Sequence, residues 1–304
     1  MSNLHIPVLL DEVVKSFINL KNGVILDATL GYGGHSSAII KSNPNIKIIA
    51  CDRDNMAIEY CKNLFKNEKR IEIYKSNFSN LLNLINPNEV CGILADIGVS
   101  SLQLDLDERG FGLNSTKLDM RMDKNQKFSA KDVVNLYSFE QLSEIFFKFG
   151  ELTNSKQIAQ KIISAREKNP INSAKELSQI IGSNNIKNRQ TKQVVLVFQA
   201  IRIEVNKELD ELSNLLKNIK NSKINNAICD IITFHSLEDR IVKNTFKEWE
   251  KSCICPEFAI KCECGNNHAI GKILNKKPIT ASNLEIKANS RSSCAKMRIF
   301  EIKR

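Results

Sequence analysis

Leu26-Asp-Ala-Thr-Leu-Gly-Tyr-Gly-Gly-His-Ser36 is the stretch that decides the fold expected for this chain. It continues the aliphatic run that begins at Gly23, whose composition is typical of a buried parallel strand. The glycines at 31–34 allow a sharp turn in which the backbone approaches a ligand closely. A helix that starts at His35 directs its free N–H groups at this turn, where an anionic group is favoured. The stretch therefore predicts a strand, a turn and a helix that cradle a ligand.

A second acidic residue supports a ligand that contains a nucleoside. An apolar run at 46–51 predicts the next strand, and it ends at Asp52, about 20 residues after the glycines, where a ribose-binding carboxylate is expected. The dinucleotide fingerprint has a third glycine at the position of Ser36, so the sequence argues against a nicotinamide cofactor. With Asp52 in register, we favour a nucleoside-containing ligand over a purely structural glycine turn.

Strand and helix patterns alternate through the first third of the chain. Strands are predicted at 24–28, 46–51, 71–74 and 92–95, with helices at 34–42, 55–65 and 79–85 between them. An amphipathic helix is expected to open the chain from His5, with Pro7 in its first turn. Open parallel sheets bind ligands beyond the carboxyl ends of their strands. The residues expected to gather at that edge are Asp27, Asp52, Phe78 and Asp96.

The alternation stops after Asp96, and helical signals take over. Capping boxes start at Ser138 and Ser173, and Gly150 and Gly182 stand where helix C-caps are expected. A strand pattern returns only at 226–235, followed by a helix at 237–249 and an antiparallel or edge strand at 295–302. We predict an α/β fold with a discontinuous catalytic domain, residues 1–104 and 220–304, and an all-helical insertion at 105–219.

Several polar residues are candidates for chemistry. Asp96 directly follows the fourth strand, where a carboxylate could accept hydrogen bonds from a substrate amine. His235 ends the fifth strand and is expected to border the same cleft, while Ser236 is interpreted as the N-cap of the next helix because it lacks a G-x-S-x-G elbow. Arg109 and the charges in 118–123 could clamp a substrate backbone or form an internal ion-pair network. Arg202 is expected to need a partner if it is buried.

Four of the nine cysteines form two closely spaced pairs, Cys253 with Cys255 and Cys262 with Cys264. Four thiolates could close a tetrahedral zinc site, although Cys-x-Cys is a less usual spacing than Cys-x-x-Cys. Four free thiols in a loop are the alternative. An odd cysteine count without an export signal argues against a disulfide framework.

The charge distribution hints at a polyanionic partner. The net charge is +10, but residues 1–107 carry 10 basic and 12 acidic groups, whereas residues 240–304 carry 14 and 6. A solvated basic face is the alternative explanation. No run is long and apolar enough to span a membrane, and the N-terminus lacks the basic region of a signal peptide, so we expect a cytoplasmic protein.

The motifs together resemble the RsmH (MraW) family of small-subunit ribosomal RNA methyltransferases. The resemblance extends from residue 5 to the basic segment before the C-terminus. It is carried by H-I-P-V-L-L-D-E at 5–12, D-A-T-L-G-Y-G-G-H-S at 27–36, D-I-G-V-S-S-L-Q-L-D at 96–105, L-D-M-R-M-D at 118–123, F-Q-A-I-R-I-E-V-N-K-E-L at 198–209 and F-H-S-L-E-D-R-I-V-K at 234–243.

The resemblance implies a class I methyltransferase fold that uses S-adenosylmethionine to methylate N4 of one cytidine in the decoding centre of 16S rRNA. Its implied partner is 16S rRNA or the small ribosomal subunit. The oligomeric state stays open, with a homodimer as one option. Asp96 is the implied catalytic residue. The implied cofactor contacts are Gly33, Gly34, His35, Asp52, Phe78, Asp96 and Gln103.

Overall fold

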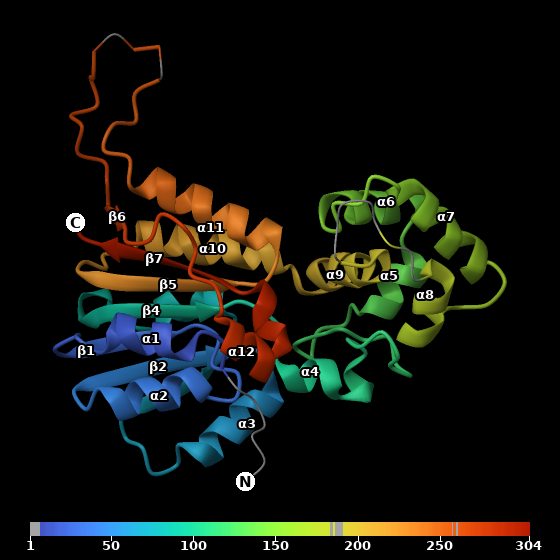
Figure 1. Ribbon diagram of the computed structural model, residues 1–304, viewed down its shortest axis with the longest axis horizontal. Coiled ribbons are helices and arrows are strands. Elements are labelled where there is room, and N and C mark those ends of the chain that lie inside the picture. The colour runs from blue at the N-terminus through green and yellow to red at the C-terminus, as the bar shows by residue number, and fades with distance from the viewer. Residues whose placement is uncertain (1–6, 183–184, 186–190, 257, 260) are drawn as a thin grey trace. The chain divides into compact units, whose positions relative to one another are not determined.

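The computed structural model describes residues 7–182, 185, 191–256, 258–259 and 261–304 (Figure 1). The chain divides into two compact units. The first comprises Met1–Gly98 together with Glu211–Arg304, and the second comprises Val99–Asp210. Within the described residues, no helix is both long and apolar enough to cross a membrane.

The first unit is built on one seven-stranded sheet in the order β3-β2-β1-β4-β5-β7-β6. β1 to β5 run parallel, and β7 is antiparallel to both of its neighbours. This confirms the predicted α/β architecture. The strands are β1 (Gly23–Asp27), β2 (Ile46–Asp52), β3 (Ile71–Lys75), β4 (Val90–Asp96), β5 (Ala227–Thr233), β6 (Gly271–Ile273) and β7 (Lys296–Ile302).

Helices cover both faces of the sheet, because alternate side chains of each buried strand point to opposite sides. One face packs through Phe17, Ile39 and Cys61 against three helices: α1 (Leu10–Phe17), α2 (Gly34–Ser42) and α3 (Asn55–Leu64). The other packs through Leu216 and Phe246 against α10 (Glu208–Asn221) and α11 (Ser236–Trp249). Both faces of the sheet are therefore buried, which agrees with the continuous apolar runs of the strands.

The helices of the second unit enclose a core of their own. Its centre contains fully buried apolar side chains from five helices, such as Val133, Phe146, Ile162, Leu177 and Val197. Among its described residues this unit contains helices and turns but no strand. Its helices are α4 (Ser101–Asp105), η3 (Asp107–Arg109), α5 (Ala130–Leu136), α6 (Phe139–Lys148), α7 (Ser155–Arg166), α8 (Ala174–Ile181) and α9 (Gln193–Asn206).

Local signals in the second unit predicted helix ends well. The capping boxes of Ser138 with Gln141 and Ser173 with Glu176 are both formed. Gly182 is the C-cap of α8 with a φ of 79°, a conformation in which glycine meets no steric penalty. Gly150 follows the C-cap of α6, which is Phe149.

Some predicted elements differ from those observed. The opening helix begins at Leu10, after Pro7 and not around it; residues 5 and 6 of the prediction lie outside the described part of the chain. The segment predicted as a helix at 79–85 is a 3₁₀ helix, η1 (Phe78–Leu84). The strand predicted at 295–302 is antiparallel but not at an edge, because the short β6 pairs with its outer side. A strand of three residues is too short to give a periodic signal, so the sequence did not predict β6.

Candidate active site

Four acidic or polar residues stand at one edge of the first unit, where parallel strands end. β1, β2 and β4 end at Asp27, Asp52 and Asp96, and β5 ends at Thr233. Because these strands are parallel and paired in register, their carboxyl ends share one edge of the sheet. This is the edge at which open α/β sheets bind ligands.

Asp27 ties the glycine turn to the end of β1. Its carboxylate is buried and accepts hydrogen bonds from Ser36 Oγ at 2.6 Å and from the Thr29 N–H at 3.2 Å. Burial raises the pKa of Asp27 above its usual value, although the Ser36 hydroxyl opposes the shift. Ser36, the residue that breaks the dinucleotide fingerprint, therefore anchors the start of α2 to the strand before it.

The glycine turn is shaped by close packing as well as by its backbone conformation. Gly33 is the N-cap of α2 with a φ of 75°, and a Cβ there would lie 2.7 Å from the Phe65 ring. At Gly34 a Cβ would lie 2.3 Å from Pro7. No side chain in the described part of the chain caps α2, so the first N–H groups of the helix remain available for an anionic ligand.

The Asp52 carboxylate accepts hydrogen bonds from backbone N–H groups of two turns. Its Oδ2 accepts from the Gly31 N–H and its Oδ1 from the Asp54 N–H, both at 2.8 Å. Burial raises the pKa of this carboxyl above its usual value, against the lowering effect of the two N–H donors. A carboxylate has about four acceptor positions, so each oxygen of Asp52 retains capacity for a ligand hydroxyl.

His35 and Asp96 form the most unusual pair in the unit. His35 Nε2 lies 3.4 Å from Asp96 Oδ2, and the His35 side chain is only 8% exposed. Within the described residues, His35 Nδ1 and Asp96 Oδ1 are buried without a hydrogen-bond partner. The Asp96 backbone is fixed by its N–H, which donates to Thr29 Oγ1 at 2.7 Å. A buried acceptor left open is costly in a folded protein, which points to a bound partner that satisfies it.

The other two predicted cofactor contacts lie in different surroundings. Phe78 starts η1 and lies three residues after Lys75, the residue that pairs with Asp52 in the sheet. The half-buried ring of Phe78 packs against the core. Gln103 belongs to the second unit. It is buried in α4, where it completes a capping box by accepting from the Ser100 N–H through its side-chain oxygen. The observed hydrogen bonds thus give Gln103 a structural role within its own unit.

His235 has the N-cap role that the sequence analysis assigned to Ser236. His235 is the N-cap of α11, and its Nδ1 accepts from the Glu238 N–H at 3.4 Å. Its Nε2 lies 3.0 Å from Oε1 of Glu238, a fully buried acid. The predicted serine cap is wrong because the reciprocal bonds from the Phe234 and His235 N–H groups to Glu238 place the cap one residue earlier. The spacing of His235 and Glu238 matches a capping box with histidine as the cap, a pattern outside the usual Ser/Thr signature.

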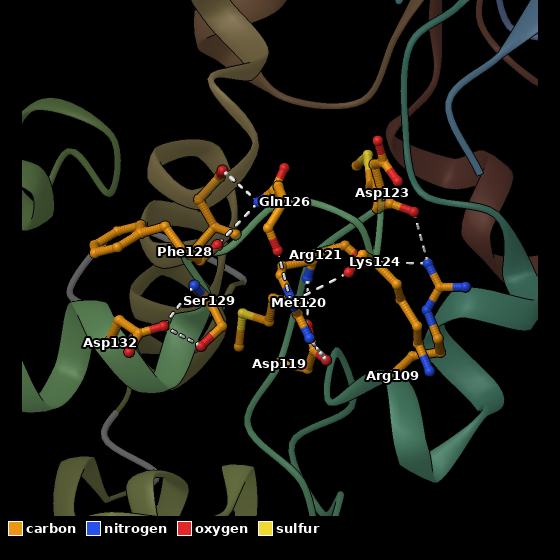
Figure 2. Close-up of polar contacts among 12 residues, drawn as sticks. Arg109, Asp119, Met120, Arg121, Asp123, Lys124, Gln126, Phe128, Ser129 and Asp132 are labelled. Atoms are coloured by element: carbon orange, nitrogen blue, oxygen red, sulfur yellow. Dashed lines mark hydrogen bonds and ion pairs between the residues drawn. The ribbon is translucent and has the colours of Figure 1, made fainter. Parts of the chain in front are cut away.

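The charged segment at 118–123 is held by internal contacts, as one of the two alternatives predicted (Figure 2). Arg121 makes two hydrogen bonds to the Asp119 carboxylate, at 2.7 and 2.8 Å. Partial burial raises the pKa of Asp119, but the Arg121 guanidinium outweighs it, so that pKa lies below its usual value. The buried Arg109 donates to the carbonyl oxygens of Arg121 and Met122 at 3.1 and 3.0 Å. These charged side chains therefore stabilise the conformation of the loop that contains them.

Arg202 has the partner that its partial burial requires. Its Nε and Nη2 both donate to the Glu208 carboxylate at 2.9 Å. Asn206 on the same helix accepts from the Met122 N–H and donates to the Met120 carbonyl oxygen. The 198–209 motif thus holds the 118–123 segment in place within the second unit.

The sequence did not predict the roles of three residues that shape the site. They are Thr29, which holds the Asp96 backbone, Ser36, which bonds Asp27, and Glu238, which binds the turn before α11. Thr29 and Ser36 lie inside the glycine-rich stretch, but short hydroxyl residues are common in turns and carry no spacing signal of their own. The role of Thr29 depends on β1 and β4 lying side by side in the sheet.

The fold and the site define a class of protein. A doubly wound sheet with an antiparallel β7 between β5 and β6, and with acids at the ends of β1, β2 and β4, is the Rossmann-like architecture of class I methyltransferases. Residues 2–303 match the MraW methylase family, and the chain belongs to that family. The resemblance predicted from the motifs is confirmed.

Close relatives match along the full length. Proteins named "Ribosomal RNA small subunit methyltransferase H" are 68% identical in Campylobacter fetus subsp. fetus and 57% identical in Campylobacter curvus, each covering 100% of this chain and 99% of its own. A putative methyltransferase from Streptococcus mutans, solved with SAH, aligns over 98% of this chain and 99% of its own at 9% identity, with a TM-score of 0.46. That structural likeness is too distant to carry an argument.

Proposed function

We propose that this protein transfers a methyl group from S-adenosylmethionine to the exocyclic N4 of a cytidine in the decoding centre of 16S rRNA. The observation that carries the proposal is the 68% identity, over the whole chain, to a protein named for methylation of small-subunit ribosomal RNA. We place this activity in the cytoplasm, where ribosomal subunits are assembled.

The first unit offers the groups that such a cofactor needs. The uncapped start of α2 at Gly33, Gly34 and His35 suits the carboxylate of the methionyl part. Asp52 retains acceptor capacity for the two ribose hydroxyls, and Phe78, which starts η1 after the neighbouring strand β3, is the proposed adenine contact. Gln103 belongs to the same proposed set, although its observed contacts lie within α4.

Asp96 is the proposed catalytic residue. The cofactor supplies a methyl group on a positively charged sulfur, which an amine nitrogen can accept directly. The cytosine amine is a weak nucleophile because its lone pair is delocalised into the ring. Asp96 Oδ1, which has no partner among the described residues, can accept a hydrogen bond from this amine and then its departing proton. His35 Nε2 lies 3.4 Å from the other oxygen, close enough for a protonated imidazole to attract it.

The helical unit is the proposed substrate-recognition domain, together with the basic C-terminal segment. A target base within folded RNA must be unstacked and turned outward to reach such a site. The surrounding phosphates then require cationic groups, and residues 240–304 carry 14 basic against 6 acidic residues.

The test is nucleoside mass spectrometry on small subunits that lack the modification, incubated with the protein and isotopically labelled cofactor. We expect labelled N4-methylcytidine. A different methylated nucleoside would assign another RNA target, and labelled protein would assign a protein substrate. Absence of any labelled product from folded, cofactor-binding protein would make it a non-catalytic RNA-binding protein. Running free 16S rRNA in parallel identifies the preferred substrate.

A further inference from the structure

Four cysteine sulfurs meet in the segment 250–270, which joins α11 to β6 and which we call the cysteine loop. Cys253, Cys255, Cys262 and Cys264 each offer a sulfur within 4.8 Å of the other three. The sulfur of Cys262 lies 3.6 Å from that of Cys253 and 3.6 Å from that of Cys264, and the third side of this triangle is 3.7 Å. Three of the sulfurs therefore form a nearly equilateral triangle.

These separations match the edges of a tetrahedron around one ion. Zinc–sulfur bonds of about 2.3 Å give sulfur–sulfur edges of roughly 3.8 Å in a tetrahedral tetrathiolate site. A disulfide requires about 2.05 Å, and all four cysteines are free. A multinuclear iron–sulfur cluster would hold its ligand sulfurs further apart. The spacing thus fits a single tetrahedral metal ion.

Backbone N–H groups point at two of the sulfurs with a reciprocal pattern. Ile254, the middle residue of the first pair, donates its N–H to Cys264 Sγ at 3.3 Å. Glu263, the middle residue of the second pair, donates to Cys255 Sγ, also at 3.3 Å. Each Cys-x-Cys turn therefore supports a sulfur of the other turn. Such donors stabilise thiolate charge and orient ligands around a metal.

The cysteine loop has little else to hold it together. Phe258 is 88% exposed and Ile254 is 60% exposed, so these two apolar side chains add almost nothing to a core, whereas Ile270 at the end of the loop packs against the core of the first unit. Figure 1 shows the loop as an extension that stands out from the ends of α11 and β6. Among its described residues it contains no helix or strand. Ordering a segment of this kind costs conformational entropy that burial does not offset, the usual situation of small metal-stabilised modules.

We propose that Cys253, Cys255, Cys262 and Cys264 form a structural zinc site that orders the cysteine loop. Four protein ligands close the coordination sphere, so the ion has no open position for catalysis. Each thiol binds as a thiolate and releases its proton to solvent, which gives a tetrathiolate site with a net charge of −2. His268 lies outside the ligand set, because its Nε2 is 2.7 Å from the Cys264 carbonyl oxygen.

The first test measures metal content. Protein produced with zinc and dialysed against metal-free buffer is analysed by elemental mass spectrometry, and we expect about one zinc per chain. The double variant C262S/C264S loses it, whereas C294S, which removes an exposed cysteine outside the loop, retains it. Zinc-free wild-type protein, stoichiometric iron, or zinc retained by the double variant would overturn the proposal.

The second test needs no variant of the site. Trypsin cleaves after lysine, and Lys251 and Lys261 are exposed within the cysteine loop. We expect wild-type protein to resist cleavage there until zinc is removed by a chelator, and to regain resistance when zinc is restored. Far-ultraviolet circular dichroism, unchanged by chelation, separates loop opening from global unfolding. Equal cleavage at these lysines with and without zinc would refute the ordering role.

Discussion

At the scale of single residues, the two oxygens of Asp96 have different environments. Oδ2 faces His35, whereas Oδ1 is buried without a partner among the described residues. Thr29 fixes the backbone of Asp96 from the neighbouring strand end. A rigid carboxylate with one open acceptor is suited to a hydrogen bond that strengthens as a reaction proceeds, because such preorganisation requires no rearrangement at the moment of reaction.

Replacing Asp96 tests this role. We expect D96N, which keeps the shape of the side chain but removes its negative charge, to lower single-turnover methyl transfer by about 10²–10⁴-fold. Cofactor affinity measured by calorimetry should change little, because Asp52 and the α2 N-terminus are intact. Undiminished transfer would remove Asp96 from the mechanism, and loss of cofactor binding would leave it only the cofactor contact that the family resemblance implies.

Asp230 should make the stability of the protein depend on pH. It lies fully buried in β5, and burial raises its pKa well above the usual value. The folded state therefore holds this proton at pH values where the unfolded chain has lost it. Between the two pKa values, the free energy of unfolding should fall with rising pH by up to about 1.4 kcal/mol per pH unit. The neutral variant D230N should remove the share of this fall that Asp230 contributes, while the buried Asp27 and Asp52 keep theirs.

Urea denaturation of wild type and D230N between pH 5 and pH 8 measures the effect. D11N, which changes an exposed acid on α1, serves as the control and should follow the wild-type curve. Parallel curves for wild type and D230N would show that the buried carboxyl does not control the pH dependence.

Single residues were predictable where their role is local and unpredictable where it depends on pairing. Asp52 and Asp96 could be found because each directly follows an apolar strand. His235 was predicted to border the cleft, and its capping role was missed because a histidine cap lies outside the Ser/Thr/Asp/Asn pattern. Thr29 gave no signal, since its partner lies 67 residues away.

At the scale of elements, the junction between α9 and α10 is the most constrained point of the second unit. Lys207 ends α9 in the left-handed conformation with a φ of 51°. The ion pair between Arg202 and Glu208 spans this turn, and its side chains are 17% and 4% exposed. A left-handed lysine costs about 1–2 kcal/mol, so the ion pair helps to maintain a turn that the backbone disfavours.

Breaking this ion pair should destabilise the protein. R202M leaves the buried Glu208 carboxylate without its guanidinium, and we expect the free energy of unfolding to fall by about 3 kcal/mol. The double variant R202M/E208Q should recover part of the loss, because it leaves no unpaired charge. Chemical denaturation of wild type, R202M, E208Q and the double variant completes a double-mutant cycle. A double variant less stable than R202M would contradict this account.

Elements with strong periodicity or capping signals were predicted almost residue for residue. The helix expected at 34–42 is α2 with the same bounds, and the box at Ser173 starts α8. The weaker elements were those without such signals. η1 is wound as a 3₁₀ helix, and β6 is a strand only because β7 offers it a partner. Tertiary pairing of this kind is invisible to local sequence patterns.

At the scale of the whole molecule, the charge is distributed unevenly along the chain. The last 65 residues carry a strong basic excess, but not all of these cations are available to a partner. Arg298 is buried against Asp239 at 2.6 Å and belongs to the fold. Arg291 is exposed, and Lys296 lies 3.7 Å from Asp239 with 40% of its side chain exposed. The last two are the better candidates for phosphate contacts.

Salt dependence of RNA binding tests these two cations. We expect affinity for small-subunit RNA to rise as salt is lowered, and each of R291Q and K296Q to reduce the slope of log affinity against log salt by about 0.7–0.9 if it removes one phosphate contact. K66Q, at an exposed lysine outside the C-terminal segment, is the control. An unchanged slope in both variants would place the RNA contacts elsewhere.

The change in the period of the hydrophobic pattern along the chain is what predicted a helical insertion at 105–219. Strand-like runs stop after Asp96 and return at Ala227, and the structure divides the chain at Gly98 and Asp210. The sequence could not place the Arg109 and 118–123 charges, because a surface clamp and an internal network have the same composition. Figure 2 shows that backbone carbonyl groups, which no sequence pattern reveals, are the partners of Arg109.

The position of β7 in the sheet affects how this protein folds during its synthesis. The strand lies between β5 and β6 and supplies Met297 and Phe300 to the two faces of the sheet, yet it starts 63 residues after β5 ends. Until those residues have been translated, β5 presents an open edge that invites pairing with other chains. A nascent chain stalled before Lys296 is therefore an aggregation hazard.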